Sequence, residues 1–516
     1  MRANPRKIAS AIFLLSHRTF FLRSSAFGIR WSTSYARRWS TPLAKSLAEA
    51  ISTTGPISVA AYIRQCLTSA SGGYYTSRLD GHDQFGQKGD FITSPEISQV
   101  FGELIGIWIV AEWMAQGKKS SGIHLMEVGP GRGTLMDDVL RTIRNFKDMA
   151  ASIEAIYMVE ASPALRDAQK NLLCGDTPIE EIDIGFRSSC KYLKQIKVIW
   201  CEDIKLVPKD NSKSPFILAH EFFDALPIHI FQSIPQKSPE PSIVTSTTAT
   251  AGRPRVLNVC QWRELVVSPT LPSSIDSTLS TSTSLRSANR PPEFQLTVSS
   301  IATPHSMYLP ETSARYKALA STPGSIIEIS PESLSYASEF AIRIGGAPAS
   351  GPASGFPLST KPTPSGAALI LDYGPAAVIP TNSLRGIQAH RIVSPFSSPG
   401  EVDLSADVDF MALAEAAINA SPGVEVHGPV EQAAWLGAMG IRERAEMLLE
   451  KAKLDTSPRA SGDREQKLKR IESGWKRLVD RGPTGMGRIY KAMAILPHYK
   501  NKSGRRPVGF GGGVTT

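Results

Sequence analysis

The sequence contains few cysteines, no CxxC pair and no long apolar run. Its five cysteines are scattered along 516 residues, so they predict neither a disulfide framework nor a zinc site, and they fit a reducing compartment. We predict no metal centre, and we find no internal repeat. The longest apolar stretch, at residues 11–22, is interrupted by His17 and Arg18, so we predict no transmembrane segment. The hydrophobic share of 41% still predicts a sizeable folded core.

The N-terminal segment has no acidic residue before Glu49, and its first 38 positions carry eight Arg or Lys residues. Without these eight the formal net charge falls from +10 to +2, so the basic character of the chain does not indicate nucleic-acid binding. An acid-free start rich in Arg and Ser is typical of a mitochondrial presequence. We place it at residues 1–40 and predict the mitochondrial matrix. A secretory signal at Ile12–Leu15 is disfavoured because the arginines are spread along the whole segment, and a disordered tail is the remaining alternative.

Composition divides the rest of the chain into ordered blocks and biased segments. Ser, Thr and Pro make up 16 of the 25 residues from 268 to 292, which is too polar a stretch to bury much surface. An ordered block near 255–266 precedes it. The predicted organisation is an N-terminal lid and helical region at 41–120, the first part of the core at 121–235, a low-complexity insert at 236–293, an accessory region at 294–343, a Gly/Pro/Ser-rich linker at 344–366, core completion with a helical accessory region at 367–498, and a flexible tail at 499–516.

Residues 124–138 have the pattern of a strand, a tight turn and a helix. The strand is predicted over His124–Val128 and the helix over Thr134–Asn145, whose apolar residues recur at helical spacing. The turn carries three closely spaced glycines, which let a ligand approach the backbone without a clash with Cβ: Gly129, Gly131 and Gly133. This order is typical of the first unit of a Rossmann-like fold.

Two details of this turn separate the cofactors that could use it. A dinucleotide site requires a small residue at position 134, where this chain has Thr134. Glu127 lies two residues before the first glycine, where its carboxylate would repel a pyrophosphate but attract the ammonium and sulfonium groups of S-adenosylmethionine. We therefore predict S-adenosyl-L-methionine as the cofactor. The plainer alternative is a glycine-rich turn beside surface acids.

Further acidic residues follow the next two predicted strands. The strand at Ala155–Val159 ends at Glu160, whose carboxylate is suited to accept hydrogen bonds from ribose hydroxyls. The strand at Lys197–Trp200 precedes Asp203, which either contacts the adenine amino group or caps a loop. We assign both acids to the cofactor site.

Several blocks, in a fixed order, resemble the MidA-type mitochondrial protein arginine methyltransferases, which act as assembly factors for respiratory complex I. The resemblance covers most of residues 55–498, apart from the insert and the linker. Besides the glycine loop, it is carried by Gly73-Tyr-Tyr-Thr-Ser77, Gly89–Ser98, Phe216–Pro227, Leu371-Asp-Tyr-Gly374, Leu384–Gly386 with His390, and Gly400–Phe410. This chain departs from the family at His220, where Asn is usual, and at the insert around 268–292.

The resemblance implies an α/β fold: a Rossmann-like class I S-adenosylmethionine-dependent methyltransferase core with an N-terminal helical lid and an accessory, mainly helical substrate-binding region. It implies type II activity, the symmetric dimethylation of an arginine on a matrix-arm subunit of complex I that is needed for complex I assembly. Asp90, Phe91 and Thr93 would lie over the methyl donor as a lid. The spacing of apolar residues predicts two helices, one starting at Ser94 and one over 428–450.

An arginine acceptor makes specific demands on the residues after the strand at 216–219. Because a guanidinium is cationic, carboxylates must hold it beside the sulfonium and localise its charge away from the attacking nitrogen. Glu221 is the first candidate for this role and Asp224 the second, although Asp224 could instead cap the following turn. His220 either relays a proton or is an ordinary paired histidine.

Other functions remain open at the level of the sequence. The chain could be a non-catalytic complex I assembly chaperone that retains a donor-binding fold, or a methyltransferase for RNA or a small molecule. The near-neutral charge outside the presequence and the lack of a basic, aromatic stripe count against RNA. Homodimerisation is a further open alternative.

Overall fold

The computed structural model describes residues 38–76, 89–90, 92–236, 260–271, 292–349, 359–454, 464–499 and 505–511. Almost all of the predicted presequence lies outside these residues, as do Phe91, most of the predicted insert and tail, and residues 350–358 of the predicted linker. The described residues from Trp39 onward belong to one compact unit. None of the described helices has the length and apolarity of a membrane span.

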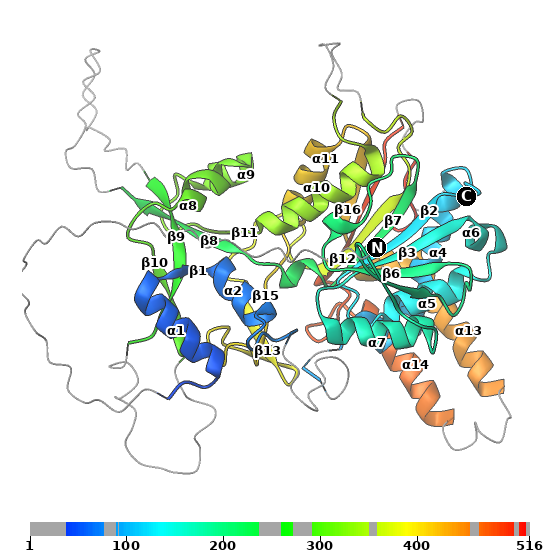
Figure 1. Ribbon diagram of the computed structural model, residues 1–516, viewed down its shortest axis with the longest axis horizontal. Coiled ribbons are helices and arrows are strands. Elements are labelled where there is room, and N and C mark those ends of the chain that lie inside the picture. Colours follow the sequence, from blue (N-terminus) through cyan, green and yellow to red (C-terminus); the bar gives the residue numbers. More distant parts are fainter. Residues whose placement is uncertain are drawn as a thin grey trace, which may run out of the picture. The chain divides into compact units, whose positions relative to one another are not determined.

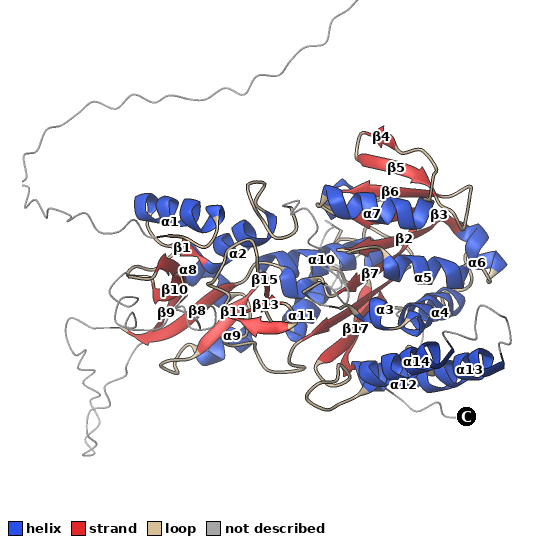
Figure 2. Cartoon of the chain, turned by 90° about the horizontal axis from the view of Figure 1, so that it is seen from below, coloured by secondary structure: helices blue, strands red, loops and turns tan. Residues whose placement is uncertain are grey.

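A nine-stranded mixed sheet forms the core of this unit (Figures 1 and 2). Its strands follow the order β16-β17-β12-β7-β2-β3-β6-β5-β4. The five strands from β12 to β6 are parallel: β12 (Ala367–Tyr373), β7 (Ser214–His220), β2 (Ile123–Val128), β3 (Ile153–Val159) and β6 (Lys197–Cys201). The flanking strands are antiparallel: β16 (Val424–Glu431), β17 (Tyr490–Pro497), β5 (Gly185–Ser189) and β4 (Glu180–Ile182). The predicted strands in the first part of the core are confirmed.

The strand order reverses between β2 and β7. From β2 the chain adds β3 and β6 on one side of the sheet and later adds β7 and β12 on the other. Crossovers that leave in opposite directions open a crevice at the carboxyl ends of the two central strands, which is where doubly wound folds bind ligands. The glycine loop follows β2, and Glu221 follows β7. The topology therefore brings the two sequence motifs to one crevice.

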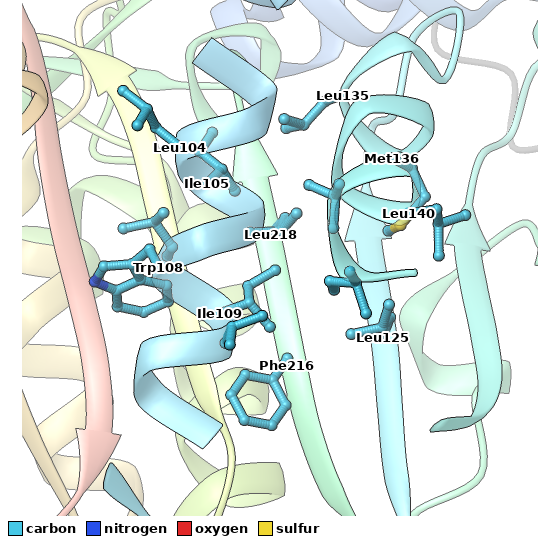
Figure 3. Packing of buried hydrophobic residues seen from close by; sticks show 14 of the residues in the cluster. Leu104, Ile105, Trp108, Ile109, Leu125, Leu135, Met136, Leu140, Phe216 and Leu218 are labelled. Carbon is cyan, nitrogen blue, oxygen red and sulfur yellow. The ribbon is translucent and has the colours of Figure 1, made fainter. Parts of the chain in front are cut away.

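Helices cover both faces of the sheet. One face packs against α4 (Gln99–Ala115), α5 (Thr134–Ile143), α7 (Pro163–Cys174) and α12 (Gln432–Ala438), and the other against α10 (Pro331–Gly345) and α11 (Phe410–Ala420). Figure 3 shows Leu104, Ile105, Trp108 and Ile109 of α4 beside the apolar residues of β2, β7 and α5. Full burial of each such side chain contributes about 1.5–3 kcal/mol, so this packing fixes the sheet on which the crevice is built.

The helix expected from Ser94 is two helices, α3 (Ser94–Ile97) and α4. Ser98 separates them in an extended conformation, with φ −154° and ψ 124°, and its side chain caps α4. The prediction of a single helix was wrong because apolar spacing alone does not show this break. The bend lets α3 reach the crevice while α4 packs on the sheet.

The predicted accessory region at 294–343 contains several helices and two strands. These strands belong to a second, five-stranded sheet that was not predicted and is here called the accessory sheet. Its strands are β1 (Ile57–Ser58), β8 (His229–Pro235), β9 (Cys260–Pro269), β10 (Phe294–Val298) and β11 (Ile326–Ile329), with helices α1 (Pro42–Thr54), α2 (Val59–Thr68), α8 (Pro304–Tyr308) and α9 (Ala314–Leu319) around it. The ten-residue β9 lies inside the segment predicted as a low-complexity insert. Trp262, Glu264 and residues 265–267 of this strand are buried. This burial stabilises β9, although the segments on either side of it in the sequence are rich in polar residues.

The C-terminal part also differs from the prediction. The helix expected over 428–450 starts only at Gln432, because β16 runs to Glu431 and pairs with β17. Beyond α12 the chain turns at Gly440, whose φ is 80°, and continues in α13 (Ile441–Leu454) and α14 (Arg464–Val479). A third, three-stranded sheet consists of β13 (Arg385–Gln388), β14 (Arg391–Val393) and β15 (Asp403–Ser405).

Candidate active site

The glycine loop is a tight turn in which each of the three predicted glycines has a positive φ. The angles are 61° at Gly129, 53° at Gly131 and 83° at Gly133, a region that L-residues with side chains rarely adopt. A Cβ on Gly129 would also lie 2.5 Å from Cδ2 of Phe222. The glycine at this position therefore lets the loop after β2 approach the turn after β7.

A cavity of about 220 Å³ lies at the crevice between these two turns. Its walls come from the glycine loop, the end of β3, the turn after β7 and the segment that leads into α3. Among its lining residues are Thr93, Glu96, Glu127, Gly129, Gly131, Arg132, Glu160, His220 and Glu221. The structure thus brings together most of the residues assigned to the cofactor from the sequence.

Glu127 is the most unusual group in this cavity. Its side chain is buried, and Oε2 has no hydrogen-bond partner among the described residues. Burial, together with a smaller effect of the nearby Glu160, raises the pKa of Glu127 to about 8, against the effect of a hydrogen bond from the backbone of Met136. An unpartnered buried carboxylate is costly, and a cationic ligand would remove that cost. The site therefore fits the ammonium of an amino-acid donor.

Glu160 is held by a small network that the sequence did not reveal. Its Oε1 accepts from Ser162 N at 2.8 Å, and its Oε2 accepts from Gln169 Nε2 at 3.3 Å. The same Gln169 nitrogen donates to the carbonyl of Gly131 at 2.6 Å, and Gln169 Oε1 accepts from Trp200 Nε1 at 3.0 Å. Burial raises the pKa of Glu160 to about 7. Gln169 thus fixes the glycine loop relative to the acid that follows β3.

Three of the residues predicted to bind the cofactor do not line this cavity. Asp90 is buried elsewhere: it accepts from Tyr74 Oη at 2.8 Å and from Ala389 N at 2.7 Å, so it holds the turn between β13 and β14. Asp203 accepts from Lys205 N at 2.8 Å and caps a short 3₁₀ helix, η1 (Ile204–Leu206). Gly133 is the N-cap of α5. Thr93 does line the cavity, and Phe91 lies outside the described residues.

A second cavity, of about 700 Å³, adjoins the first. Its charged and aromatic lining consists of four acids, three cations and three tyrosines: Glu221, Asp224, Asp403, Asp407, Arg385, Arg488, Lys491, Tyr75, Tyr373 and Tyr490. Two residues, Tyr75 and Glu221, line both cavities. A group that enters the second cavity can therefore reach Glu221, which also lines the cavity at the glycine loop.

Asp224 lies in the wall of this second cavity. Its Oδ2 accepts from the hydroxyl of Tyr373, which also contacts Ser405. Its Oδ1 is buried and has no hydrogen-bond partner among the described residues. Burial raises the pKa of Asp224 to about 6, in spite of the hydrogen bond from Tyr373. Like Glu127, this carboxylate has an oxygen that a cationic donor group could satisfy.

Asp372, at the end of β12, holds the turn that carries these acids. Its fully buried carboxylate accepts from Phe222 N at 3.1 Å, Phe223 N at 2.9 Å and Tyr373 N at 2.9 Å. These bonds fix the turn in which Glu221 has a φ of 48°, a strained value for a residue with a side chain. No role for Asp372 was predicted, although its place at a strand end was a usable signal.

Glu221 lines both cavities. Its Oε1 accepts from the backbone N of Ser94 at 3.3 Å and lies 3.2 Å from His220 Nε2. The ring of His220 contacts that of Phe101, with centroids 5.1 Å apart. Asp409, in the Gly400–Phe410 block, lines neither cavity. It caps α11 and pairs with Arg315 at 2.8 Å.

Comparison with known proteins agrees with this geometry. Residues 104–430 match the Methyltransf_28 family of S-adenosyl-L-methionine-dependent methyltransferases. The rat protein arginine methyltransferase NDUFAF7, mitochondrial, is 34% identical over 465 residues, which are 89% of this chain and 85% of the rat protein. The human NDUFAF7 is 32% identical over 467 residues (90% and 85%), and the Drosophila melanogaster homolog is 33% identical over 468 (90% and 87%). This chain belongs to the NDUFAF7/MidA family of protein arginine methyltransferases.

The fold of this NDUFAF7-family chain also occurs in a bacterial protein of known structure. A COG1565 superfamily member from Burkholderia thailandensis, solved with bound S-adenosyl-homocysteine, aligns with a TM-score of 0.57 at 19% identity and covers 91% of this chain and 92% of its own. A native structure of a COG1565 protein from the same organism gives a TM-score of 0.55. The mixed α/β fold is shared, and the predicted cofactor, S-adenosylmethionine, is that of the family.

The raised pKa of Glu127 predicts that donor affinity rises with pH. Below about pH 8 the carboxyl is mostly protonated and must lose its proton to bind the ammonium, which itself stays cationic up to about pH 7.7. Because binding of the donor then releases one proton, its affinity should rise by up to about tenfold between about pH 6 and pH 7. The ligand-free fold shows the opposite trend, because a raised carboxyl pKa stabilises the protein at low pH and that contribution is lost as the pH rises towards 8.

Calorimetric titration with S-adenosyl-homocysteine at about pH 6 and pH 7 measures this dependence. The variant Glu127→Gln serves as the control: it cannot ionise, so much of the slope should disappear, and the slope that remains reports Glu160. An affinity of the unsubstituted chain that is the same at both pH values would contradict the assignment of Glu127 to the ammonium.

Proposed function

We propose that this chain is an S-adenosylmethionine-dependent protein arginine methyltransferase with a Rossmann-like class I core. The donor would occupy the 220 Å³ cavity and the acceptor guanidinium the 700 Å³ cavity. The observation that carries the proposal is the position of Glu221, a carboxylate that lines both cavities and lies in a turn held by a buried acid. Asp224 supports a cationic acceptor, because its buried Oδ1 has no hydrogen-bond partner among the described residues, whereas Asp407 in the same cavity is paired with Arg385 at 2.8 Å.

When bound, S-adenosylmethionine supplies an electrophilic methyl group on a sulfonium. The residues of the chain would align the acceptor with it and compensate charge, the two effects that lower the barrier of an in-line displacement most. Glu221 and Asp224 would each accept hydrogen bonds from the guanidinium and draw its positive charge towards the nitrogens that do not react. Tyr75, between the cavities, would exclude water from the path of the methyl group.

The proposal extends to the compartment and the substrate. Relatives named as mitochondrial enzymes and an acid-free, Arg-rich N-terminus support the mitochondrial matrix as the compartment. We further propose symmetric, type II dimethylation of an arginine on a matrix-arm subunit of complex I, in support of assembly. This finer assignment comes from the resemblance to the MidA-type family.

Mass spectrometry of mitochondrial proteins from cells with and without this chain tests the proposal. One arginine of a matrix-arm subunit should lose the mass of two methyl groups, and fragment spectra should distinguish the symmetric from the asymmetric isomer. The control is the deficient strain complemented with the unsubstituted chain. If no arginine changes although the purified chain binds the donor, the acceptor is RNA or a small molecule, or the chain is a chaperone.

A further inference from the structure

A cluster of two histidines and one glutamate lies on the accessory sheet, and its residues line neither of the cavities described above. His229 comes from β8, Glu264 from β9 and His305 from α8, and their ligand atoms all lie within 4.8 Å of one another. His229 and Glu264 are buried, whereas the side chain of His305 is 52% exposed. The three residues are 35 or more positions apart, so sequence spacing gave no sign of a site.

The cluster has the charge and the orientation that a divalent cation requires. Glu264 Oε1 lies 2.7 Å from His229 Nδ1, and Oε2 accepts from the hydroxyl of Thr303 at 2.5 Å, so the carboxylate is fixed by an outer partner, as is usual for metal ligands. The ring centroids of His229 and His305 lie 4.1 Å apart, and the two ring planes are tilted by 36°.

We infer that His229, Glu264 and His305 form a binding site for a zinc ion. Two imidazoles and a carboxylate are a known zinc ligand set, and the exposed side of His305 leaves the fourth position to water. The ion would replace the proton between His229 and Glu264. Ligands at about 2.1 Å from zinc lie about 3.4 Å apart in tetrahedral geometry. The ligand atoms here lie within 4.8 Å of one another, and His305 Nδ1 is 3.9 Å from Glu264 Oε2, so the half-exposed His305 would move inward when the ion binds. A bound ion would tie α8 to the sheet.

Titration of the chelator-treated full chain with Zn²⁺, in the absence of methyl donor, tests this inference. We expect one equivalent to bind, the melting temperature to rise, and protons to be released. The variant His305→Ala, which changes a half-exposed side chain and should leave the fold intact, should weaken binding by at least about tenfold. Cobalt(II) in place of zinc should give the visible spectrum of a tetrahedral site in the unsubstituted chain only.

A matched control is available at Glu425, which also lies beside two histidines, His427 and His498. His498 lies 3.2 Å from Glu425 Oε2, and its side chain is 45% exposed. The variant His498→Ala should leave zinc binding unchanged. Loss of binding in His498→Ala and not in His305→Ala would overturn the inference, as would the absence of any zinc binding or of any shift in melting temperature. None of these outcomes affects the proposed methyltransferase activity.

Discussion

Replacement of Glu221 by Gln should abolish most methyl transfer and leave the donor bound. The amide keeps the shape of the side chain and can still accept from the backbone of Ser94, so the turn after β7 should hold. It no longer carries the negative charge that the guanidinium requires. By analogy with the removal of one preorganised electrostatic partner in other enzymes, turnover should fall by about 10²- to 10³-fold. Incorporation of labelled methyl into an arginine peptide measures this loss, and calorimetry with S-adenosyl-homocysteine measures retained binding.

The matched control for this variant is Glu103→Gln. Glu103 is buried to a similar degree, with a side chain 13% exposed against 11% for Glu221, but it pairs with Arg444 and lines neither cavity. Its turnover should stay close to that of the unsubstituted chain. If Glu221→Gln retained full turnover, the proposed placement of the acceptor would be wrong. If it lost turnover but still supported complex I assembly, the chaperone alternative would be favoured.

The core of the site could be predicted because its signals are local in the sequence. The strand, the three glycines and Glu127 lie within eleven residues, and strand-end acids such as Glu160 follow from the geometry of a parallel sheet. The same reasoning identified Glu221. No local signal showed that Asp372, at the end of a strand about 150 residues further along the chain, would stabilise the turn that carries Glu221. Contacts of that range depend on which strands become neighbours, here β7 and β12.

The failures have a related physical cause. Asp90 belongs to a motif that resembles the family, but a motif does not show whether its carboxylate faces a ligand or a backbone turn, and here it binds the backbone of Ala389. The ordered block predicted near 255–266 overlaps β9, but composition did not show that this block is a strand of the accessory sheet. Its stability comes from antiparallel pairing with β8 and β10, which lie before and after it in the chain.

Replacement of Gly131 by Val should abolish donor binding. Gly131 lines the donor cavity and has a φ of 53°, where a β-branched residue is a steric outlier that costs about 1–3 kcal/mol. The isopropyl group would in addition occupy space that the donor needs. We expect affinity for S-adenosyl-homocysteine to fall by at least about 100-fold, equivalent to about 2.8 kcal/mol.

Backbone strain alone could unfold this variant, and Gly175→Val separates the two effects. Gly175 ends α7 with a φ of 60°, and a Cβ there would have no neighbour within 4 Å. It carries a comparable backbone strain without obstructing the cavity, so its melting temperature should fall while donor affinity stays the same. Circular dichroism should show that Gly131→Val is folded at the temperature of the titration. If Gly131→Val is folded and binds the donor normally, the donor does not lie over the glycine loop. The roles proposed for Glu127 and Glu221 would then be wrong as well.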